Sequence, residues 1–346
     1  MAARLKPLAQ QVIVITGASS GHGLATARKA ATAGARVMLA ARDETALSAA
    51  CGQIESAGGS AAYTVCDVGS ESDVERLAAA TIERWGGFDT WVNNAGVGVY
   101  AEALDISTKE HRQVFETNYW GVVHGSLAAV RHLKDKPDGG ALINVGSVNG
   151  DMGGPLLSAY NASKHAVKGF TDSLRIELIA ADAPLSVTLV KPSAIGTPFP
   201  QHGRNLTGYE ARLPQPLYAP ELVADAILAA AQTAHRTITV GGVGKLQVIG
   251  ATLLPMLFDQ VASRMGPTLV DRDKPTPRVD GNLFAPQGHD GAVEGQQHGR
   301  RVSSYTSARL NPIASLAMVA AAGAISVAMT AARGLETRRD RIKRAT

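Results

Sequence analysis

The residues Thr16-Gly17-Ala18-Ser19-Ser20-Gly21-His22-Gly23 decide the fold of this chain, because glycines cluster where a buried strand passes into a helix. The apolar run Val12–Thr16 precedes this turn, and a helix-like segment at about 22–34 follows it. Glycine allows a tight turn and lets backbone N–H groups approach a pyrophosphate, while the helix N-terminus adds partial positive charge. The turn indicates a dinucleotide site; a turn that needs glycine only for its geometry is the alternative.

Outward from this turn, short apolar runs alternate with helical stretches, which is typical of βαβ units and a parallel sheet. The predicted strands are Val12–Thr16, Arg36–Ala41, Ala61–Cys66, Asp89–Asn93, Ala141–Val145, Ser186–Val190 and Thr237–Val240. The predicted helices cover about 22–34, 43–57, 71–86, 108–134, 158–180 and 220–233. The pattern predicts an α/β fold with one doubly wound parallel sheet, in a domain spanning residues 8–245.

Composition and charge narrow the class of protein. Hydrophobic residues make up 45% of the 346 residues, enough for a full core. The formal charge is +4, and residues 333–346 alone carry six basic and two acidic groups, so the rest of the chain is balanced. A basic face for nucleic acid is therefore not expected on the main domain.

Cysteine and histidine usage argues against a metal site. Cys51 and Cys66 have no metal-ligand spacing, no histidine cluster occurs, and free thiols in a reducing compartment are expected. The stretch Met1–Gln11 has no apolar run long enough for a signal peptide, so we expect a cytoplasmic catalytic domain.

The glycine spacing is GxxxGxG, and with it the chain resembles the short-chain dehydrogenase/reductase family, in the single-domain subgroup with TGxxxGxG and YxxxK motifs. Asn93-Asn94-Ala95-Gly96 resembles that family's NNAG. The resemblance implies a Rossmann-like fold and an adenine contact by Asp67, for which a turn or N-cap aspartate is the alternative. The residues implied in cofactor binding are Gly17, Ser19, Ser20, Gly21, His22, Gly23, Arg42, Asp67, Val68, Asn94, Ala95, Gly96, Tyr160, Lys164, Pro192 and Thr197.

The choice of cofactor is read at the end of the second strand, in Ala40-Ala41-Arg42-Asp43. Ala41 stands where an acid would select NAD(H), and an arginine such as Arg42 can hold the 2′-phosphate of NADP(H). We therefore favour NADP(H). NAD(H) stays the alternative, because Arg42 could merely cover adenine, and Asp43 could be the acid or the N-cap of the next helix.

The chemical residues follow the fifth strand. Ser147 precedes Tyr160-Asn161-Ala162-Ser163-Lys164, and a helix there places Tyr160 and Lys164 on one face. We expect the nearby ammonium to lower the pKa of the phenol and a serine hydroxyl to stabilise developing charge on oxygen. The family resemblance implies Tyr160 as proton donor or acceptor, Lys164 as a ribose ligand, and Ser147 and Asn118 as further catalytic residues.

After the sixth strand, the resemblance places Pro192 and Thr197 in a cofactor loop, and residues 198–219 fit a substrate lid. The apolar side chains available there are Phe199, Leu206, Tyr209, Leu213 and Leu217. His22 stands where the family usually has an aliphatic residue, and we interpret it as a tolerated side chain. His165 is expected to be structural.

The C-terminal hundred residues lie outside the resemblance. Residues 245–265 could form an apolar helix interrupted by Pro255, and 266–311 fit an extended arm or a disordered linker. Residues 312–332 are uncharged and long enough for a bilayer, but only marginally apolar. A membrane anchor with the basic tail 333–346, a packing helix and a mobile tail are the three alternatives.

Together these features predict an oxidoreductase that transfers a hydride between NADP(H) and a small carbonyl or alcohol. The alternative from another class is a silent cofactor-binding scaffold or redox sensor of the same fold. Related proteins often pair through the helices near 108–134 and 158–180, so a homo-oligomer is a further expectation.

Overall fold

Seven parallel strands form the central sheet in the order β10-β7-β6-β4-β1-β2-β3. The computed structural model describes residues 4–288 and 291–310, and residues up to Ser303 belong to one compact unit. The strands are β1 Val12–Thr16, β2 Arg36–Ala41, β3 Ser60–Val65, β4 Thr90–Asn93, β6 Gly140–Val145, β7 Leu185–Pro192 and β10 Thr237–Val240. The predicted doubly wound sheet is confirmed, and each strand end lies within two residues of its predicted place.

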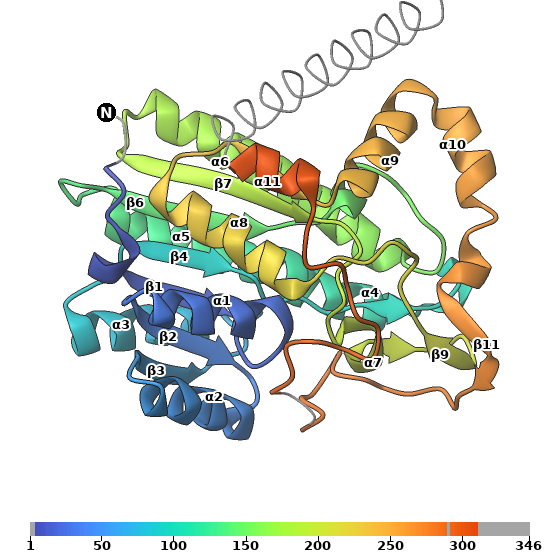
Figure 1. Cartoon of the computed structure of the whole chain (residues 1–346), viewed down its shortest axis with the longest axis horizontal. Coiled ribbons are helices and arrows are strands. Elements are labelled where there is room, and N and C mark those ends of the chain that lie inside the picture. Colours follow the sequence, from blue (N-terminus) through green and yellow to red (C-terminus); the bar gives the residue numbers. More distant parts are fainter. Residues whose placement is uncertain (1–3, 289–290, 311–346) are drawn as a thin grey trace, which may run out of the picture. The chain divides into compact units, whose positions relative to one another are not determined.

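Helices cover both faces of this sheet (Figure 1). On one face lie α1 Gly21–Thr32, α2 Glu44–Ser56 and α8 Pro220–Gln232; on the other lie α3 Glu71–Trp85, α5 Gly121–Leu133 and α6 Ser158–Ala180. The central strands β1, β4 and β6 are buried along their whole length, as strands covered on both faces should be. The strand order reverses between β1 and β4, and the carboxyl ends of the strands there open a crevice suited to a ligand.

The predicted helix 108–134 is divided into three parts. Helix α4 (Thr108–Phe115) passes through a π-helical turn, Glu116–Trp120, before α5 begins. This wider turn carries Asn118, whose side chain is fully buried. Single π-helical turns are common at functional sites, and sequence periodicity cannot reveal them because only one residue is inserted.

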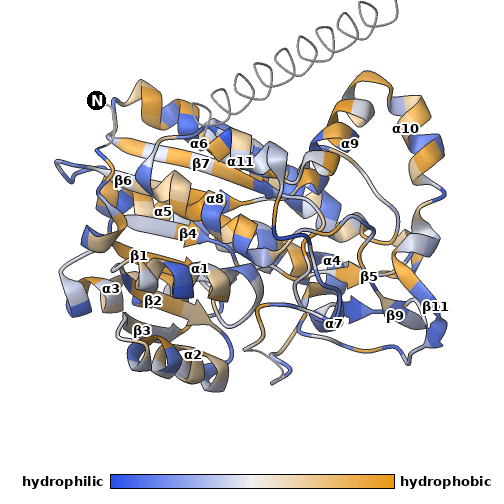
Figure 2. Cartoon of the chain, viewed as in Figure 1, coloured by the Kyte–Doolittle hydropathy of each residue, from blue (hydrophilic) through white to orange (hydrophobic). Residues whose placement is uncertain are grey.

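Residues 242–288 and 291–303 build on the side of the domain where the strands end. Helices α9 (Gly242–Leu253) and α10 (Pro255–Ala262) form a hairpin that breaks at Pro255, as expected (Figure 1). One side of it contacts the domain through Val248 and Phe258. Much of the hairpin is hydrophobic (Figure 2). Its exposed hydrophobic side chains are Leu246, Ile249, Leu253, Leu254, Met256, Leu257 and Val261.

Two small sheets and several short helices complete the fold. Strand β5 (Val99–Tyr100) pairs with β8 (Arg204–Asn205), and β9 (Tyr209–Ala211) pairs with β11 (Val270–Pro275). The short helices are α7 Phe199–His202 and α11 Ser304–Leu310, with 3-10 turns at Leu8–Gln10, Ala103–Asp105, Val148–Gly150 and Gly266–Thr268. In residues 4–288 and 291–310, no helix is long and apolar enough to cross a bilayer. The predictions for 312–332 and 333–346 lie outside the described residues.

The sequence predicts either an extended arm or a disordered linker for residues 266–311. The described residues up to 303 run as an extended arm along the domain. We call residues 279–288 and 291–300 of this arm the strap. Val279 exchanges backbone hydrogen bonds with Asn205, both 3.0 Å long, and Leu283 is fully buried beside Val97 and Val99. The strap is therefore part of the folded domain.

Candidate active site

One continuous cavity lies at the carboxyl ends of the strands. It is lined by the glycine-rich turn, the end of β2, the NNAG segment, Ser147, Tyr160, Lys164 and the loop after β7. Of the residues predicted from the sequence, Gly23 and Asn118 do not line it. The fold thus brings together residues predicted for catalysis and for cofactor binding that are up to 180 positions apart.

The glycine-rich turn is fixed by its neighbours. Gly17 has a φ of +64°, and a Cβ there would lie 2.6 Å from Cα of Ala95, so this position requires glycine. Asn94 donates from Nδ2 to the carbonyl oxygens of Thr16 (2.8 Å) and Gly17 (3.0 Å). The NNAG segment therefore holds the turn in place, as expected from its position after β4.

Gly23 lies behind the cavity wall, where a side chain could not fit. A Cβ there would lie 2.2 Å from the carbonyl oxygen of Gly17. Glycine at this position thus allows the close packing of α1 against the turn.

The two carboxylates at the part of the cavity predicted to bind adenosine, Asp67 and Asp43, already have partners. Asp67 accepts a hydrogen bond from the N–H of Gly69 at 3.0 Å, which is the turn alternative considered for it, and it also lines the cavity. Asp43 accepts from the N–H of Ala46 at 3.0 Å and so caps α2. Because Asp43 caps α2, Arg42 is the better candidate of the two for contacting the ribose of a bound cofactor.

Arg42 makes an unexpected contact. Its guanidinium donates to the backbone carbonyl oxygens of Asn282 and Leu283 in the strap. Arg42 and Asn282 both line the cavity. Sequence reasoning missed the strap, because a stretch rich in Gly, Pro and polar residues has no periodicity that could place it.

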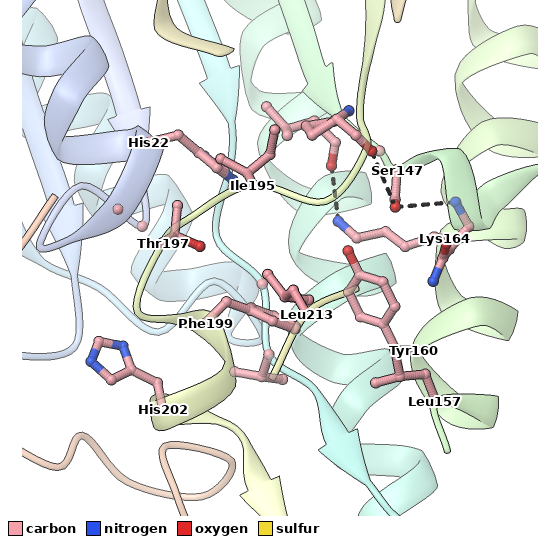
Figure 3. Close-up of a pocket in the computed structure, with 18 of the residues that line it drawn as sticks. His22, Ser147, Leu157, Tyr160, Lys164, Ile195, Thr197, Phe199, His202 and Leu213 are labelled. Carbon is pink, nitrogen blue, oxygen red and sulfur yellow. Dashed lines mark hydrogen bonds between the residues drawn. The ribbon is translucent and has the colours of Figure 1, made fainter. Parts of the chain in front are cut away.

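The predicted catalytic residues Ser147, Tyr160 and Lys164 lie together in the cavity (Figure 3). The Lys164 ammonium donates to the carbonyl oxygen of Val145 at 2.9 Å and lies 5.7 Å from the centre of the Tyr160 ring. Ser147 accepts from the N–H of Asn149 at 3.1 Å, and its hydroxyl also interacts with the Tyr160 phenol. Helix α6 provides Tyr160 and Lys164 one turn apart, as the sequence indicated.

The electrostatics correct one expectation. We expected the ammonium to lower the pKa of Tyr160, but burial raises it to about 12, and only the hydrogen bond with Ser147 opposes that rise. Burial also lowers the pKa of Lys164 to about 8. Both pKa shifts have the same main cause, because the two side chains lie in a desolvated site. The Lys164 ammonium directs its hydrogen bond to the Val145 carbonyl.

Asn118 lies behind the chemical residues. Its Oδ1 accepts from the N–H of Val97 at 2.8 Å, and its Nδ2 donates to the Val97 carbonyl and to Ser163 Oγ, both at 3.0 Å. A Cβ at Gly96 would lie 3.5 Å from Asn118 Oδ1 and 3.8 Å from Lys164 Nζ. The side-chain amide of Asn118 thus joins the π-helical turn to Val97, directly after the NNAG segment, and to α6.

Two further side chains that line the cavity, His22 and Cys66, are neutral. Burial is the main reason that the pKa of His22 falls to about 4, and the Lys164 ammonium lowers it further, so the imidazole is uncharged at neutral pH. Cys66 and Cys51 are free, and burial raises the pKa of the Cys66 thiol to about 12. Among the described residues no cluster of metal ligands occurs.

The substrate end differs in part from expectation. Phe199 and Leu213 of the lid line the cavity, whereas Leu206 packs in a core cluster, Leu217 is buried elsewhere and Tyr209 lies on β9. Sequence reasoning missed the part of the wall that comes from the α9–α10 region, namely Gln247, Phe258, Ala262, Met265 and Leu269. The apolar pattern of 245–265 was the available signal, but it did not show which face turns inward.

Comparison with known proteins agrees with this geometry. The family model described as short chain dehydrogenase matches residues 11–205. The chain belongs to the short-chain dehydrogenase family. This dehydrogenase is 42% identical over 322 residues to an uncharacterised oxidoreductase, YxnA, of Bacillus subtilis, covering 92% of this chain and 90% of the relative. It is 32% identical over 260 residues to 3beta-hydroxysteroid dehydrogenase 1 of Eggerthella lenta, covering 75% and 91%.

Solved structures show the same relationship. A short-chain dehydrogenase/reductase from Burkholderia phymatum in complex with NAD superposes with a TM-score of 0.63 at 26% identity, covering 77% of this chain and 99% of that one. An alcohol dehydrogenase from Thermococcus sibiricus complexed with 5-hydroxy-NADP gives a TM-score of 0.58 at 25% identity, covering 66% and 95%. This dehydrogenase is an oxidoreductase of a family that acts on alcohol and carbonyl groups with NAD(P).

Proposed function

We propose that this chain is an NADP(H)-dependent oxidoreductase that transfers a hydride between the nicotinamide and a carbonyl or alcohol substrate, with Tyr160 as general acid or base. The observation that carries the proposal is the continuous cavity described above. Tyr160, Lys164 and Ser147 line one part of it, and Arg42 and Asp67 line another, with the glycine-rich turn in the same wall.

The residues present fit a dinucleotide. The turn at Gly17–Gly21 presents backbone to the cavity, and Thr197 of the loop after β7 comes close to it, since a Cβ at Gly21 would touch Thr197 at 3.4 Å. Arg42 provides a planar donor group suited to a phosphate. Lys164, Pro192 and Thr197 would hold the nicotinamide half, and Asp67 and Val68 the adenine.

The protonation states suit proton transfer to a substrate oxygen. A bound nicotinamide supplies the hydride in reduction and accepts it in oxidation. Because the pKa of Tyr160 is about 12, its phenol is protonated at neutral pH and can donate its proton to the substrate oxygen. Ser147 can donate a second hydrogen bond to that oxygen, and the Lys164 ammonium 5.7 Å from the ring can stabilise the phenolate left behind.

The part of the cavity away from the glycine-rich turn and Arg42 has a lining that supports an apolar ketone or secondary alcohol as substrate. Its side chains there include Leu157, Phe199, Leu213, Phe258, Met265 and Leu269. Such a wall favours a substrate that offers one polar oxygen and an otherwise apolar body. The relative named as a 3beta-hydroxysteroid dehydrogenase is in line with a substrate of this kind.

A screen of apolar ketones and alcohols tests this function, with absorbance at the nicotinamide band as the readout and NADPH and NADH compared in parallel. Turnover in wild type that is lost in Tyr160→Phe supports it. Tight binding of NADPH with no turnover of any substrate would favour the alternative, a silent cofactor-binding scaffold or sensor.

A cytoplasmic catalytic domain that contacts membranes through residues 312–346 is a further part of the proposal, and so is a homo-oligomer. The residues 312–346 lie outside those described. Washing isolated membranes with salt and then with carbonate tests the contact, because full release by carbonate rules out a spanning helix.

A further inference from the structure

The strap is attached to the dinucleotide-binding face at three places. At its start, Leu283 is fully buried and the N–H of Asn282 donates to the His202 carbonyl at 2.7 Å. In the middle, the N–H of Gly291 donates to the Ser19 carbonyl, and the N–H of Gly21 donates to the Ala292 carbonyl, both at 2.9 Å. The strap therefore lies against the same turn that the family motif identifies as the pyrophosphate site.

The third attachment lies at the end of the strap. The Gln297 side chain accepts from the N–H of Leu213 at 2.7 Å and donates to the Leu213 carbonyl at 3.1 Å. The N–H of Gly295 donates to the Gly196 carbonyl at 2.9 Å, and the N–H of Arg300 donates to the Leu217 carbonyl at 2.8 Å. The same stretch thus contacts the lid and the loop that carries Thr197.

Arg42 connects the strap to the adenosine end of the cavity. The burial of Leu283 fixes the carbonyl oxygens of Asn282 and Leu283, and these two oxygens hold the Arg42 guanidinium. A guanidinium has five N–H donors, so donors remain for a phosphate when two carbonyls are bound. Carbonyl oxygens are neutral, and they orient the guanidinium without neutralising its charge.

We propose that the strap is a built part of the NADP(H) site, in which Asn282 and Leu283 position Arg42 for the 2′-phosphate and residues 291–300 close over the glycine-rich turn. This inference rests on the proposed cofactor preference and goes beyond it, because the positioning residues come from outside the matched residues 11–205. Asn282 and Leu283 are positioning residues, and their effect is specific to ligands that carry the 2′-phosphate.

The test uses the full chain and two ligands without nicotinamide, adenosine 2′,5′-bisphosphate and AMP. We expect calorimetry to show the bisphosphate binding at least about tenfold more tightly, the value of one charge-assisted hydrogen bond of roughly 1.4 kcal/mol. Gly291, Gly295 and Arg300 donate their N–H groups to the domain. A ligand bound beneath residues 291–300 should make the opening of these hydrogen bonds rarer, so hydrogen exchange should show added protection of a peptide covering this segment.

Two variants separate positioning from general stability. Leu283→Ala removes the buried anchor, and we expect it to weaken the bisphosphate several-fold while AMP is nearly unaffected; Leu104→Ala, at a side chain 99% exposed, is the matched control. Gly299→Ala puts a Cβ 2.2 Å from the Tyr218 carbonyl carbon and should reduce the protection of 291–300. Gly52→Ala, whose Cβ meets nothing within 4 Å, is its control.

The outcomes are distinguishable. Equal weakening of both ligands in Leu283→Ala overturns the positioning of Arg42. Bisphosphate binding without any change in exchange of 291–300 overturns the closure. If the bisphosphate binds and slows hydrogen exchange of residues 291–300 while no carbonyl substrate is turned over, the proposed reaction is wrong and the strap inference stands. If neither a dinucleotide nor a fragment of one binds, both proposals are wrong.

Discussion

The ammonium of Lys164 lies 5.7 Å from the centre of the Tyr160 ring and is held there by the carbonyl oxygen of Val145. Helix α6 provides both side chains and the end of β6 provides the carbonyl, so the pair depends on the packing of helix against sheet. Burial shifts the pKa of each group toward its neutral form, to about 12 for Tyr160 and about 8 for Lys164.

Replacing Tyr160 by Phe removes the proposed proton donor and little else, because the ring remains. We expect kcat to fall by roughly 10²–10⁴, the usual contribution of general acid–base catalysis. Steady-state kinetics with a responsive ketone measures the loss, and nicotinamide fluorescence should show NADPH binding retained. Undiminished turnover in the variant would remove Tyr160 from the mechanism.

The pH dependence follows from Lys164. Its pKa of about 8 means that the ammonium is present below that pH and is lost as the pH rises through it, whereas Tyr160 stays protonated until about 12. Because kcat/KM reports the pKa values of the free enzyme, we expect kcat/KM for reduction to decline above about pH 8. His22, with a pKa of about 4, contributes nothing between pH 6 and 9.

Lys164→Arg is the matched variant for that profile. Arginine keeps its charge to a much higher pH, so whatever activity it retains should show no decline near pH 8. A decline at the same pH in wild type and variant would assign the titration to another group.

Arg42 controls the choice between cofactors in our proposal. Arg42→Ala should raise the Kd for NADPH by about tenfold to a hundredfold, since charge-assisted hydrogen bonds to a phosphate are lost, while the Kd for NADH changes little. Fluorescence titration with both cofactors measures the ratio. An equal loss for the two would mean that Arg42 holds the strap without contacting the phosphate.

Replacing Gly125 or Gly169 by alanine should change the thermal stability of the protein in opposite directions. Both lie in helices, where alanine is normally more stable than glycine by roughly 1 kcal/mol. A Cβ at Gly125 would lie 2.0 Å from Asn93 Oδ1 and 2.7 Å from Trp91 Nε1, whereas one at Gly169 meets nothing within 4 Å.

We therefore expect Gly125→Ala to unfold at lower temperature and Gly169→Ala to unfold at the same or a higher temperature. Thermal unfolding followed by circular dichroism compares them directly. A stabilised Gly125→Ala would show that α5 can move away from β4 without cost.

Much of the fold could be predicted from the sequence because its signals are local. Strand β1, the glycine turn and helix α1 all lie within residues 12–32, and the apolar pattern that marks each further strand is equally local. Tyr160 and Lys164 are one helical turn apart, so their spacing alone indicated a shared face.

The parts that could not be predicted depend on contacts between distant residues. The π-helical turn at Asn118 is stabilised by Val97 and Ser163, and the pKa of Tyr160 depends on how much of the protein surrounds it. The contact of Arg42 with Asn282 joins residues 240 positions apart, and nothing in either local sequence indicates it.

That separation also has a consequence for the order of events during synthesis. The glycine turn and Arg42 leave the ribosome early, and Asn282 follows 240 residues later, roughly 10 to 50 s at ordinary elongation rates. A nascent chain in which the other cavity-lining segments are already made therefore still lacks this contact until residue 282 has emerged. A chain that stops short of Asn282 keeps the whole matched segment 11–205 and still lacks the contact that holds Arg42 in place.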